Sequence, residues 1–305
     1  MKSVRIHSYG DNSVVRIEDI EKPTPGPGEL LIKVAAAAVN PVDVQIREGK
    51  LQQMLHHTLP ITLGCDVSGT VESGEGFAPG SPIYGYLNLA RLGAFAEFAI
   101  VKKEEASLAP ASLDFIHVAA VPVAVLTAWQ GLFDMANLEF GQTVLIHAAS
   151  GGVGSMAVQL AKWKGAHVIA TASEGNREYV GALGADEFID YKSQRFEDGL
   201  SGVDVVFDTM GGETQERSFS VLKSGGYLVS TVSPPAENKA KAAGVRATMM
   251  AVKPDGARLT EVAKMFDDNL LKTLVEYKFP LEDAVKAFEM SAKGRVRGKI
   301  VLTVS

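Results

Sequence analysis

A glycine-rich loop is the part of this sequence whose residue types and spacing are most specific for a chemical task. It follows an apolar run at 144–148, opens a helical pattern at 153–164, and consists of Ala149, Ser150, Gly151, Gly152, Val153 and Gly154. This is the G-x-G-x-x-G spacing with Ala149 at the first position. A small first residue makes the tight turn, Gly151 admits a pyrophosphate to the backbone amides, and Gly154 lets the helix pack closely on the sheet. The loop therefore predicts a dinucleotide site; the alternative is a glycine turn that serves only packing.

The end of the next predicted strand indicates which dinucleotide is bound. NAD sites place a carboxylate there to bond the ribose 2′-hydroxyl, whereas this chain has Thr171, Ala172 and Ser173. Ser173 and Arg177 are able to donate to a 2′-phosphate, which favours NADP (NADPH). Two alternatives stay open. Glu174 serves as the NAD acid if the strand runs two residues longer, and Arg177 is otherwise a solvated helix residue.

Charge and cysteine content exclude several classes of function. There is one cysteine, Cys65, so a disulfide or a multi-cysteine metal site is excluded. The net charge of −6 gives no electrostatic basis for binding nucleic acid or an anionic membrane. Residues 1–12 hold no apolar signal region, and the most apolar stretch, 118–129, is too short to span a bilayer. We expect a cytoplasmic protein.

The pattern of short elements predicts two domains in these 305 residues. As far as about residue 113, short β-branched or aromatic runs separated by turns predict a small β-barrel or sandwich, at 3–7, 14–18, 30–34, 69–72 and 95–101. Beyond about 115, strands alternate with helices, which is typical of a parallel sheet. We expect at least five parallel strands, at 144–148, 167–171, 187–189, 203–207 and 227–231. The predicted α/β fold is completed by two amphipathic helices, at 259–266 and 281–288, and by a closing strand at 300–304.

Several further stretches carry a resemblance to a known family. They occur in order along the whole chain, at 39–49, 63–69, 93–98, 126–129, 149–154, 183–186 and 297–302. On these residues the chain resembles the medium-chain dehydrogenase/reductases of the zinc-free quinone oxidoreductase type, the group that includes zeta-crystallin. The resemblance implies a chaperonin-10-like (GroES-like) β-barrel catalytic domain over 1–115 and 250–305, and a Rossmann doubly wound parallel-sheet domain that binds NADP over 116–249. It also implies a homodimer, with 226–232 as a candidate edge strand for the contact.

The same resemblance implies roles for individual residues. Similar proteins place the equivalent of Asn40 beside the nicotinamide ribose, that of Asp43 near the same wall, and that of Thr127 by the nicotinamide. Around the 2′-phosphate they place the equivalents of Ser173, Arg177 and Tyr191. Asn40 and Asp43 are alternatively turn residues around Pro41, and Thr127 a satisfied core hydroxyl. Gln45 stands where similar proteins often carry a tyrosine, so no ring-stacking role is expected at that wall.

No metal is expected. Zinc alcohol dehydrogenases of this superfamily place a cysteine near Asn40 and a histidine–glutamate pair near Cys65 and Asp66, together with a separate four-cysteine lobe. Because tetrahedral zinc needs three or four converging N or S ligands, the remaining candidates, His56, His57 and Cys65, do not make a recognisable site. We interpret the two histidines as a surface or loop pair and Cys65 as a buried small hydrophobe.

The resulting functional hypothesis is reduction of an activated acceptor. Without a Lewis acid to polarise a simple alcohol or ketone, the easier reaction is hydride transfer from NADPH to a small-molecule quinone. The alternatives are an enone or 2-alkenal (double-bond) reductase, a more distant enoyl thioester reductase, and a non-catalytic NADPH-binding stress or structural protein. Tyr84 and Tyr86 either line the cleft or are structural; no general acid is assigned.

Overall fold

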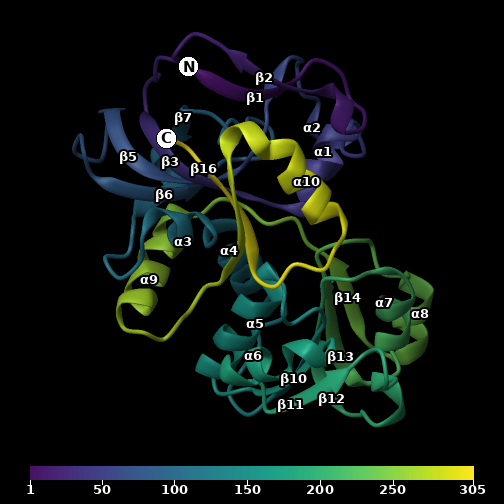
Figure 1. The fold of residues 1–305 in the computed structure, drawn as a ribbon. Coiled ribbons are helices and arrows are strands. Elements are labelled where there is room, and N and C mark those ends of the chain that lie inside the picture. Colours follow the sequence, from purple (N-terminus) through teal and green to yellow (C-terminus); the bar gives the residue numbers. More distant parts are fainter. The chain divides into compact units, whose positions relative to one another are not determined.

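The computed structural model describes residues 1–305, and the chain divides into two units. The first unit comprises Met1–Val123, Lys253–Asn269 and Thr273–Ser305, and the second comprises Ala124–Val252 and Leu270–Lys272. The first is therefore built from both ends of the chain, and the second is inserted between them (Figure 1).

Strand β3 (Glu29–Val39) is the centre of the main sheet of the first unit. It pairs along its length with β5 (Asp66–Gly74) on one side. On the other side, β7 (Phe98–Lys102) pairs with residues 29–33 and β16 (Lys299–Thr303) with residues 36–39. The register against β5 shifts between Val34 and Ala36, and such irregularities bend a strand. One long strand thus joins β5 and β7 to β16, the last strand of the chain.

The predicted strand at 30–34 is too short, because β3 continues to Val39. Residues 35–38 are all alanine, a residue with poor β-propensity. Ala36 and Ala38 are fully buried and pack, with Val301, against Ala119 and Ala120 at the end of α3 (Phe115–Ala119). The small side chains therefore let a helix lie close on the sheet, a tertiary reason that local propensity does not contain.

The remaining strands of the first unit complete two sheets. The main sheet has the order β15-β16-β3-β5-β6-β8, with β15 (Val275–Pro280), β6 (Pro82–Tyr86) and β8 (Ala106–Leu108). A smaller antiparallel sheet has the order β2-β1-β4, formed by β2 (Val15–Asp19), β1 (Lys2–Ile6) and β4 (Ile61–Thr62). The helices are α1 (Pro41–Arg47), α2 (Gln52–Leu55), α3, α9 (Gly256–Asp267) and α10 (Ala284–Ala292).

The two amphipathic helices predicted near the end of the chain are confirmed. In α9 the predicted apolar face, Leu259, Val262, Ala263 and Phe266, is buried. The second pattern forms a short 3₁₀ turn at Leu281–Asp283 followed by α10, in which Phe288 is fully buried. Spacing of i, i+3, i+4 therefore located both faces correctly.

The second unit is a six-stranded parallel sheet with the order β11-β10-β9-β12-β13-β14. Its strands are β9 (Thr143–Ile146), β10 (His167–Ala172), β11 (Glu187–Asp190), β12 (Val203–Asp208), β13 (Leu222–Ser230) and β14 (Arg246–Met249). Counted along the chain, this is the order 3-2-1-4-5-6 of a doubly wound sheet. The predicted α/β class and the five predicted parallel strands are confirmed, and β14 is a sixth.

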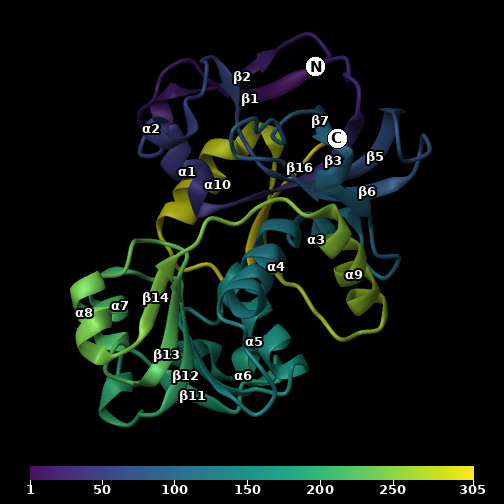
Figure 2. The same ribbon diagram turned by 180° about the vertical axis from the view of Figure 1, so that it is seen from behind.

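Helices cover both faces of this sheet. Helices α5 (Gly152–Trp163) and α6 (Arg177–Ala182) lie on one face, and α7 (Gly212–Ser218) and α8 (Glu237–Ala243) on the other, as Figures 1 and 2 show together. Helix α4 (Pro122–Trp129), which leads from one unit into the other along the chain, continues into a π-helical turn at Gln130–Met135. The sheet faces are thus buried on both sides, as parallel strands require.

The predicted edge strand at 226–232 is wrong. These residues fall mostly in β13, which has β12 on one side and β14 on the other. The edges are β11 and β14. β14 was missed because its four residues are half-buried or exposed, so it has no apolar run to mark it.

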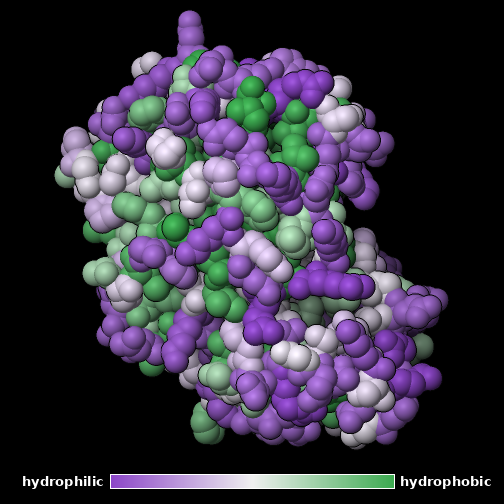
Figure 3. Space-filling view, in the orientation of Figure 1, coloured by the Kyte–Doolittle hydropathy of each residue, from purple (hydrophilic) through white to green (hydrophobic).

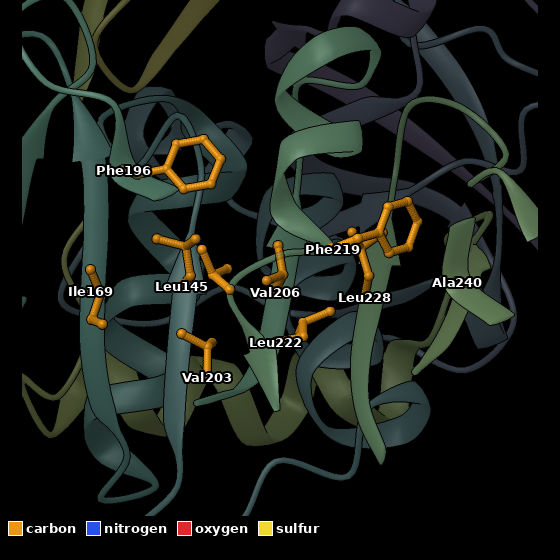
Figure 4. Close-up of a cluster of buried hydrophobic side chains, with 10 residues drawn as sticks. Leu145, Ile169, Phe196, Val203, Val206, Phe219, Leu222, Leu228 and Ala240 are labelled. Atoms are coloured by element: carbon orange, nitrogen blue, oxygen red, sulfur yellow. The ribbon is translucent and has the colours of Figure 1, made fainter. Parts of the chain in front are cut away.

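The core of the second unit lies between the sheet and its helices. Figure 4 shows Leu145, Val206 and Leu228 from three neighbouring strands pointing into one cluster, with Phe196 and Phe219 above them. These side chains bury the middle strands and leave their carboxyl ends for polar residues.

The surface is mixed, and no helix of the chain combines the length and the apolar character needed to cross a membrane. On the face drawn in Figure 3, hydrophilic residues cover much of the surface and hydrophobic residues lie between them.

Candidate dinucleotide and active site

The turn between β9 and α5 adopts a conformation that few side chains tolerate. Ala148 has a φ of +48°, in the left-handed region. The neighbouring Ala149 is fully buried, and its N–H donates to the Thr171 carbonyl at 3.0 Å. The strained turn residue is therefore Ala148 and not Ala149, which the sequence pattern had placed at the turn. Non-glycine residues held in this region are found preferentially at functional sites.

Two glycines of the loop meet different surroundings. A Cβ on Gly154 would lie 2.3 Å from the Ala148 carbonyl oxygen and 2.8 Å from the Ala149 Cα, so no side chain fits there. A Cβ on Gly151 would meet only the Ala148 oxygen, at 3.4 Å. Gly154 thus allows α5 to pack against the end of β9, while the space over Gly151 is open.

The loop fits a pyrophosphate. The first N–H groups of α5, those of Gly152, Val153 and Gly154, have no acceptor within the helix, and the helix dipole adds partial positive charge there. Their position after the first strand of a doubly wound sheet, where the strand order reverses between β9 and β12, is where such sheets bind ligands. The structure therefore brings the loop residues Ala149 to Gly154 together in one turn, and binding of a dinucleotide there stays a prediction.

A buried histidine fixes the strand end beside the loop, and sequence analysis gave it no role. His147 is 1% exposed; its Nδ1 lies 3.0 Å from Thr171 Oγ1 and its Nε2 lies 2.9 Å from Ser218 Oγ. Ser218 donates its own proton to the Thr214 carbonyl, so His147 Nε2 must be the donor and Nδ1 the acceptor. Burial lowers the pKa of His147 to about 4, and the neutral ring ties β9 to β10 and α7.

Asp208 fixes the end of β12 through hydrogen bonds of its buried side chain. Its carboxylate is fully buried at the end of the strand. It accepts hydrogen bonds at 2.8–2.9 Å from the N–H groups of Met210 and Gly211, from Gln215 Nε2 and from Ser230 Oγ. The available signal for both residues was a polar side chain directly at the end of an apolar strand.

The residues expected around a 2′-phosphate follow β10 and β11. Strand β10 ends at Ala172, and Glu174 begins a short 3₁₀ turn, so the strand does not extend to Glu174. Ser173 Oγ accepts a bond from Asn176 Nδ2 at 3.1 Å, and Tyr191 is 59% exposed. Arg177 pairs with Glu174 through two hydrogen bonds of 2.7 and 2.8 Å.

A buried polar cluster lies in the first unit around Asn40, which precedes α1. Asn40 Nδ2 donates to Asp66 Oδ2 at 2.9 Å, and Lys299 Nζ donates to Asn40 Oδ1 at 2.5 Å and to Asp66 Oδ2 at 3.1 Å. Asp66 Oδ1 accepts the Val123 N–H at 2.7 Å. The Lys299 and Asp66 side chains are 7% and 0% exposed. A lysine near the end of the chain thus supplies the positive charge of the cluster, and sequence analysis did not identify it.

Asp43 lies beside this cluster in the third position of α1. Its Oδ2 accepts the Asn40 N–H at 2.8 Å, whereas its Oδ1 is buried without a hydrogen-bond partner. Burial raises the pKa of Asp43 to about 7. The interpretation of Asn40 and Asp43 as turn residues explains the contact to the Asn40 N–H, but it does not explain the bonds of the Asn40 side chain.

The other sequence candidates have plainer surroundings. Cys65 is a buried thiol, as predicted, and burial raises its pKa. Tyr84 Oη donates to the Leu259 carbonyl at 2.6 Å in the core, which is the structural alternative. Thr127 is buried on α4, and Gln45 is half-buried on α1. No group of three or more His, Cys, Asp or Glu side chains is arranged to hold a metal ion.

Comparisons with known proteins agree with this architecture. The family described as alcohol dehydrogenase GroES-like domain matches residues 26–111, and that described as zinc-binding dehydrogenase matches residues 183–302. The mitochondrial NAD(P)H oxidoreductase RTN4IP1 of Mus musculus is 33% identical over 98% of this chain and 88% of its own length. The 2-methylene-furan-3-one reductase of Solanum lycopersicum is 33% identical over 99% of this chain and 79% of its own length. The quinone oxidoreductase structure from Coxiella burnetii has a TM-score of 0.91 at 32% identity, covering 100% of this chain and 99% of that one. The expected GroES-like and Rossmann folds are confirmed.

Gly154→Ala is expected to remove dinucleotide binding. The new Cβ would overlap the Ala148 backbone, so the turn must shift, and we expect a loss of about 1–3 kcal/mol in the free energy of unfolding. Gly181→Ala in α6 is the control, because a Cβ there meets nothing within 4 Å. Fluorescence titration with NADPH and urea unfolding measure the two effects. Normal NADPH binding by Gly154→Ala would contradict the assignment of the loop.

His147→Gln is expected to change how stability depends on pH. Between about pH 4 and 6.5 His147 is protonated in the unfolded chain, where its pKa is near 6.5, but stays neutral in the folded protein, where its pKa is about 4. His147 therefore contributes stability above pH 6.5 that is lost as the pH falls to about 4. The stability difference between the wild type and His147→Gln should change by up to about 3 kcal/mol across this range. His56→Asn, at an exposed histidine, is the control for unfolding at pH 7 and pH 4; a pH-independent difference would refute the prediction.

Lys299→Met is expected to destabilise the first unit by about 3–5 kcal/mol, because it leaves Asp66 as an uncompensated buried charge. Adding Asp66→Asn should recover part of the loss, since the buried charge is then gone. Lys22→Met, which breaks the exposed pair with Glu72, should cost less than about 1 kcal/mol. Thermal and urea unfolding measure all four proteins. Equal effects of Lys299→Met and Lys22→Met would contradict the role of the buried ammonium.

Proposed function

This chain belongs to the medium-chain dehydrogenase/reductase family, in its quinone oxidoreductase group, and from that premise we propose that it transfers a hydride from NADPH to a quinone without a zinc ion. Like its relatives it is an NAD(P)H oxidoreductase. The finer statements, on the cofactor, the metal and the acceptor, are supported separately.

The observation that supports the proposal is the geometry of the turn between β9 and α5, at the point where the strand order reverses. The N–H groups of Gly152, Val153 and Gly154 would hold the pyrophosphate of the cofactor, and the space over Gly151 would admit it. Ser173, Arg177 and Tyr191 would serve the 2′-phosphate, which supports NADPH. Bound there, the nicotinamide supplies a hydride equivalent for reduction.

The donor set around Asn40 supports chemistry without zinc. Cys65 is the only thiol of the chain, and it accepts a weak bond from Asn40 Nδ2 at 3.6 Å. The ammonium of Lys299 already lies within hydrogen-bonding distance of Asn40 and Asp66. A divalent cation placed among these groups would be repelled by that ammonium at short range.

Quinone reduction suits such a site. A quinone accepts hydride readily, and the oxyanion that forms needs hydrogen-bond donors more than a Lewis acid. The Coxiella burnetii structure, similar over the whole chain, is described as a quinone oxidoreductase. Asn40, Asp43 and Thr127 are the catalytic candidates of this proposal. A cytoplasmic location and a homodimer remain predictions.

A second acceptor class is favoured by a specific comparison. The Solanum lycopersicum relative is described as a 2-methylene-furan-3-one reductase, and the β-carbon of an enone accepts hydride to give an enolate. Enones and 2-alkenals are therefore the alternative acceptors.

An acceptor panel tests the proposal. The purified protein should bind NADPH more tightly than NADH and oxidise it with 9,10-phenanthrenequinone or 1,4-benzoquinone, with slower turnover on 3-buten-2-one and on enoyl thioesters. Incubation with a chelator should leave the rate unchanged. Loss of activity on chelation that zinc restores would refute the zinc-free mechanism, and faster turnover on enones would favour the second class. Tight cofactor binding without turnover of any acceptor would refute a reductase function.

A further inference from the structure

The arginine expected at the 2′-phosphate is already paired with a carboxylate. Arg177 Nε donates to Glu174 Oε1 at 2.7 Å, and Nη2 donates to Glu174 Oε2 at 2.8 Å. This is the two-pronged geometry with which a guanidinium binds carboxylates and phosphates alike. The edge of Arg177 that is best suited to a phosphate is therefore occupied by Glu174.

Neighbouring groups hold the guanidinium in this place. Its Cζ lies 4.4 Å from the centre of the Phe188 ring, on β11, so the guanidinium is stacked as well as paired. The hydrogen bond to Glu174 and the charge of Glu174 raise the pKa of Arg177, and the carboxylate of Asp190, at the end of β11, adds a smaller effect in the same direction. A phosphate that approaches Arg177 thus meets the repulsion of Glu174 and Asp190 as well as the attraction of the guanidinium, and Lys192 is a further cation near Asp190.

The pair is exposed enough for a ligand to displace it. The side chains of Arg177 and Glu174 are 50% and 60% exposed, and exposed pairs of this kind favour the paired state by only about two- to fivefold. Ser173 Oγ accepts from Asn176, which leaves its hydroxyl proton for a phosphate or a ribose hydroxyl. Glu174 therefore weakens binding of a 2′-phosphate without blocking the site.

We propose that Glu174 is a specificity-determining residue that competes with the 2′-phosphate of NADP for Arg177 and so keeps the preference for NADPH over NADH narrow. The inference rests on the proposed dinucleotide site, whose cofactor it deepens. It makes Glu174 neither the NAD acid nor an inert surface residue: Glu174 opposes NADPH by occupying Arg177, and it leaves the binding of NADH largely unchanged.

Calorimetric titration with two adenosine probes tests this without any turnover. The probes are 2′,5′-ADP, which carries the 2′-phosphate, and 5′-AMP, which has a 2′-hydroxyl. Glu174→Gln should tighten 2′,5′-ADP about two- to fivefold, the strength of the exposed pair it removes, and change 5′-AMP by less than about twofold. Glu178→Gln is the matched control, since Glu178 is an exposed glutamate of α6 whose loss changes the net charge equally.

A second background isolates the competition. Arg177→Gln should weaken 2′,5′-ADP, and Glu174→Gln should give no gain in that background, because the group for which it competes is gone. Equal 2′,5′-ADP affinities for Glu174→Gln and Glu178→Gln would overturn the inference. The proposed function would still stand if the wild-type protein binds and oxidises NADPH. Weaker 5′-AMP binding by Glu174→Gln would also overturn it, by showing Glu174 as the ribose acceptor. Failure of the wild type to bind either probe would overturn the inference together with the proposed site.

Discussion

The close approach of α5 to the end of β9 is the constraint on which the rest of the second unit depends. At Gly154 the helix backbone and the Ala148 carbonyl leave no room for a Cβ, and Ala148 is held in a left-handed conformation to make the turn. A backbone this tight exposes consecutive N–H groups at the start of a helix, and that exposure binds anions. The strain is tolerated because the strand ends around it are fixed by buried polar contacts: His147 holds β9 to β10 and α7, and Asp208 closes the turn after β12. The turn between β9 and α5 and the buried polar contacts around it thus stabilise one another.

In the first unit, too, buried polar contacts fix the position of a candidate site residue, in this case Asn40. Its charged cluster joins three distant stretches of the chain. Lys299 donates to Asn40, which lies 259 positions earlier, and to Asp66, which lies 233 positions earlier. The last strand therefore completes more than a sheet: β16 brings the single ammonium that makes a buried Asp66 tolerable. Asn40 then has both of its carboxamide atoms engaged, by Lys299 and by Asp66. The side chain is held in one orientation by a network in which each member needs the others.

Sequence patterns predicted the parts of this protein whose cause is local. The glycine loop, the apolar parallel strands and the buried faces of α9 and α10 follow from spacing alone. The second half of β3 was not predicted because its alanines have poor β-propensity and are explained only by the helix that packs on them. β14 was not predicted because this edge strand has no apolar run. Lys299 lies in the stretch 297–302 that carries the family resemblance, yet its role depends on Asn40 and Asp66, more than 200 positions away, and no spacing rule connects these residues. The left-handed turn at Ala148 was missed because alanine, unlike glycine, gives no sign of it.

Each unit buries a neutral group whose pKa is shifted across the range between about pH 4 and 7, and the two groups have opposite effects on stability. His147, with its pKa lowered to about 4, makes the fold lose stability as the pH falls from about 6.5. Asp43, with its pKa raised to about 7, keeps a proton that the unfolded chain releases above about 4, so it costs stability as the pH rises toward 7. Between about pH 4 and 6.5 the unfolded chain binds about one more proton at His147 than the folded protein does, and about one fewer at Asp43. Their effects on the pH dependence of the free energy of unfolding therefore cancel. A flat pH profile of the whole chain is therefore compatible with two strongly perturbed groups, and only the removal of one of them uncovers the other.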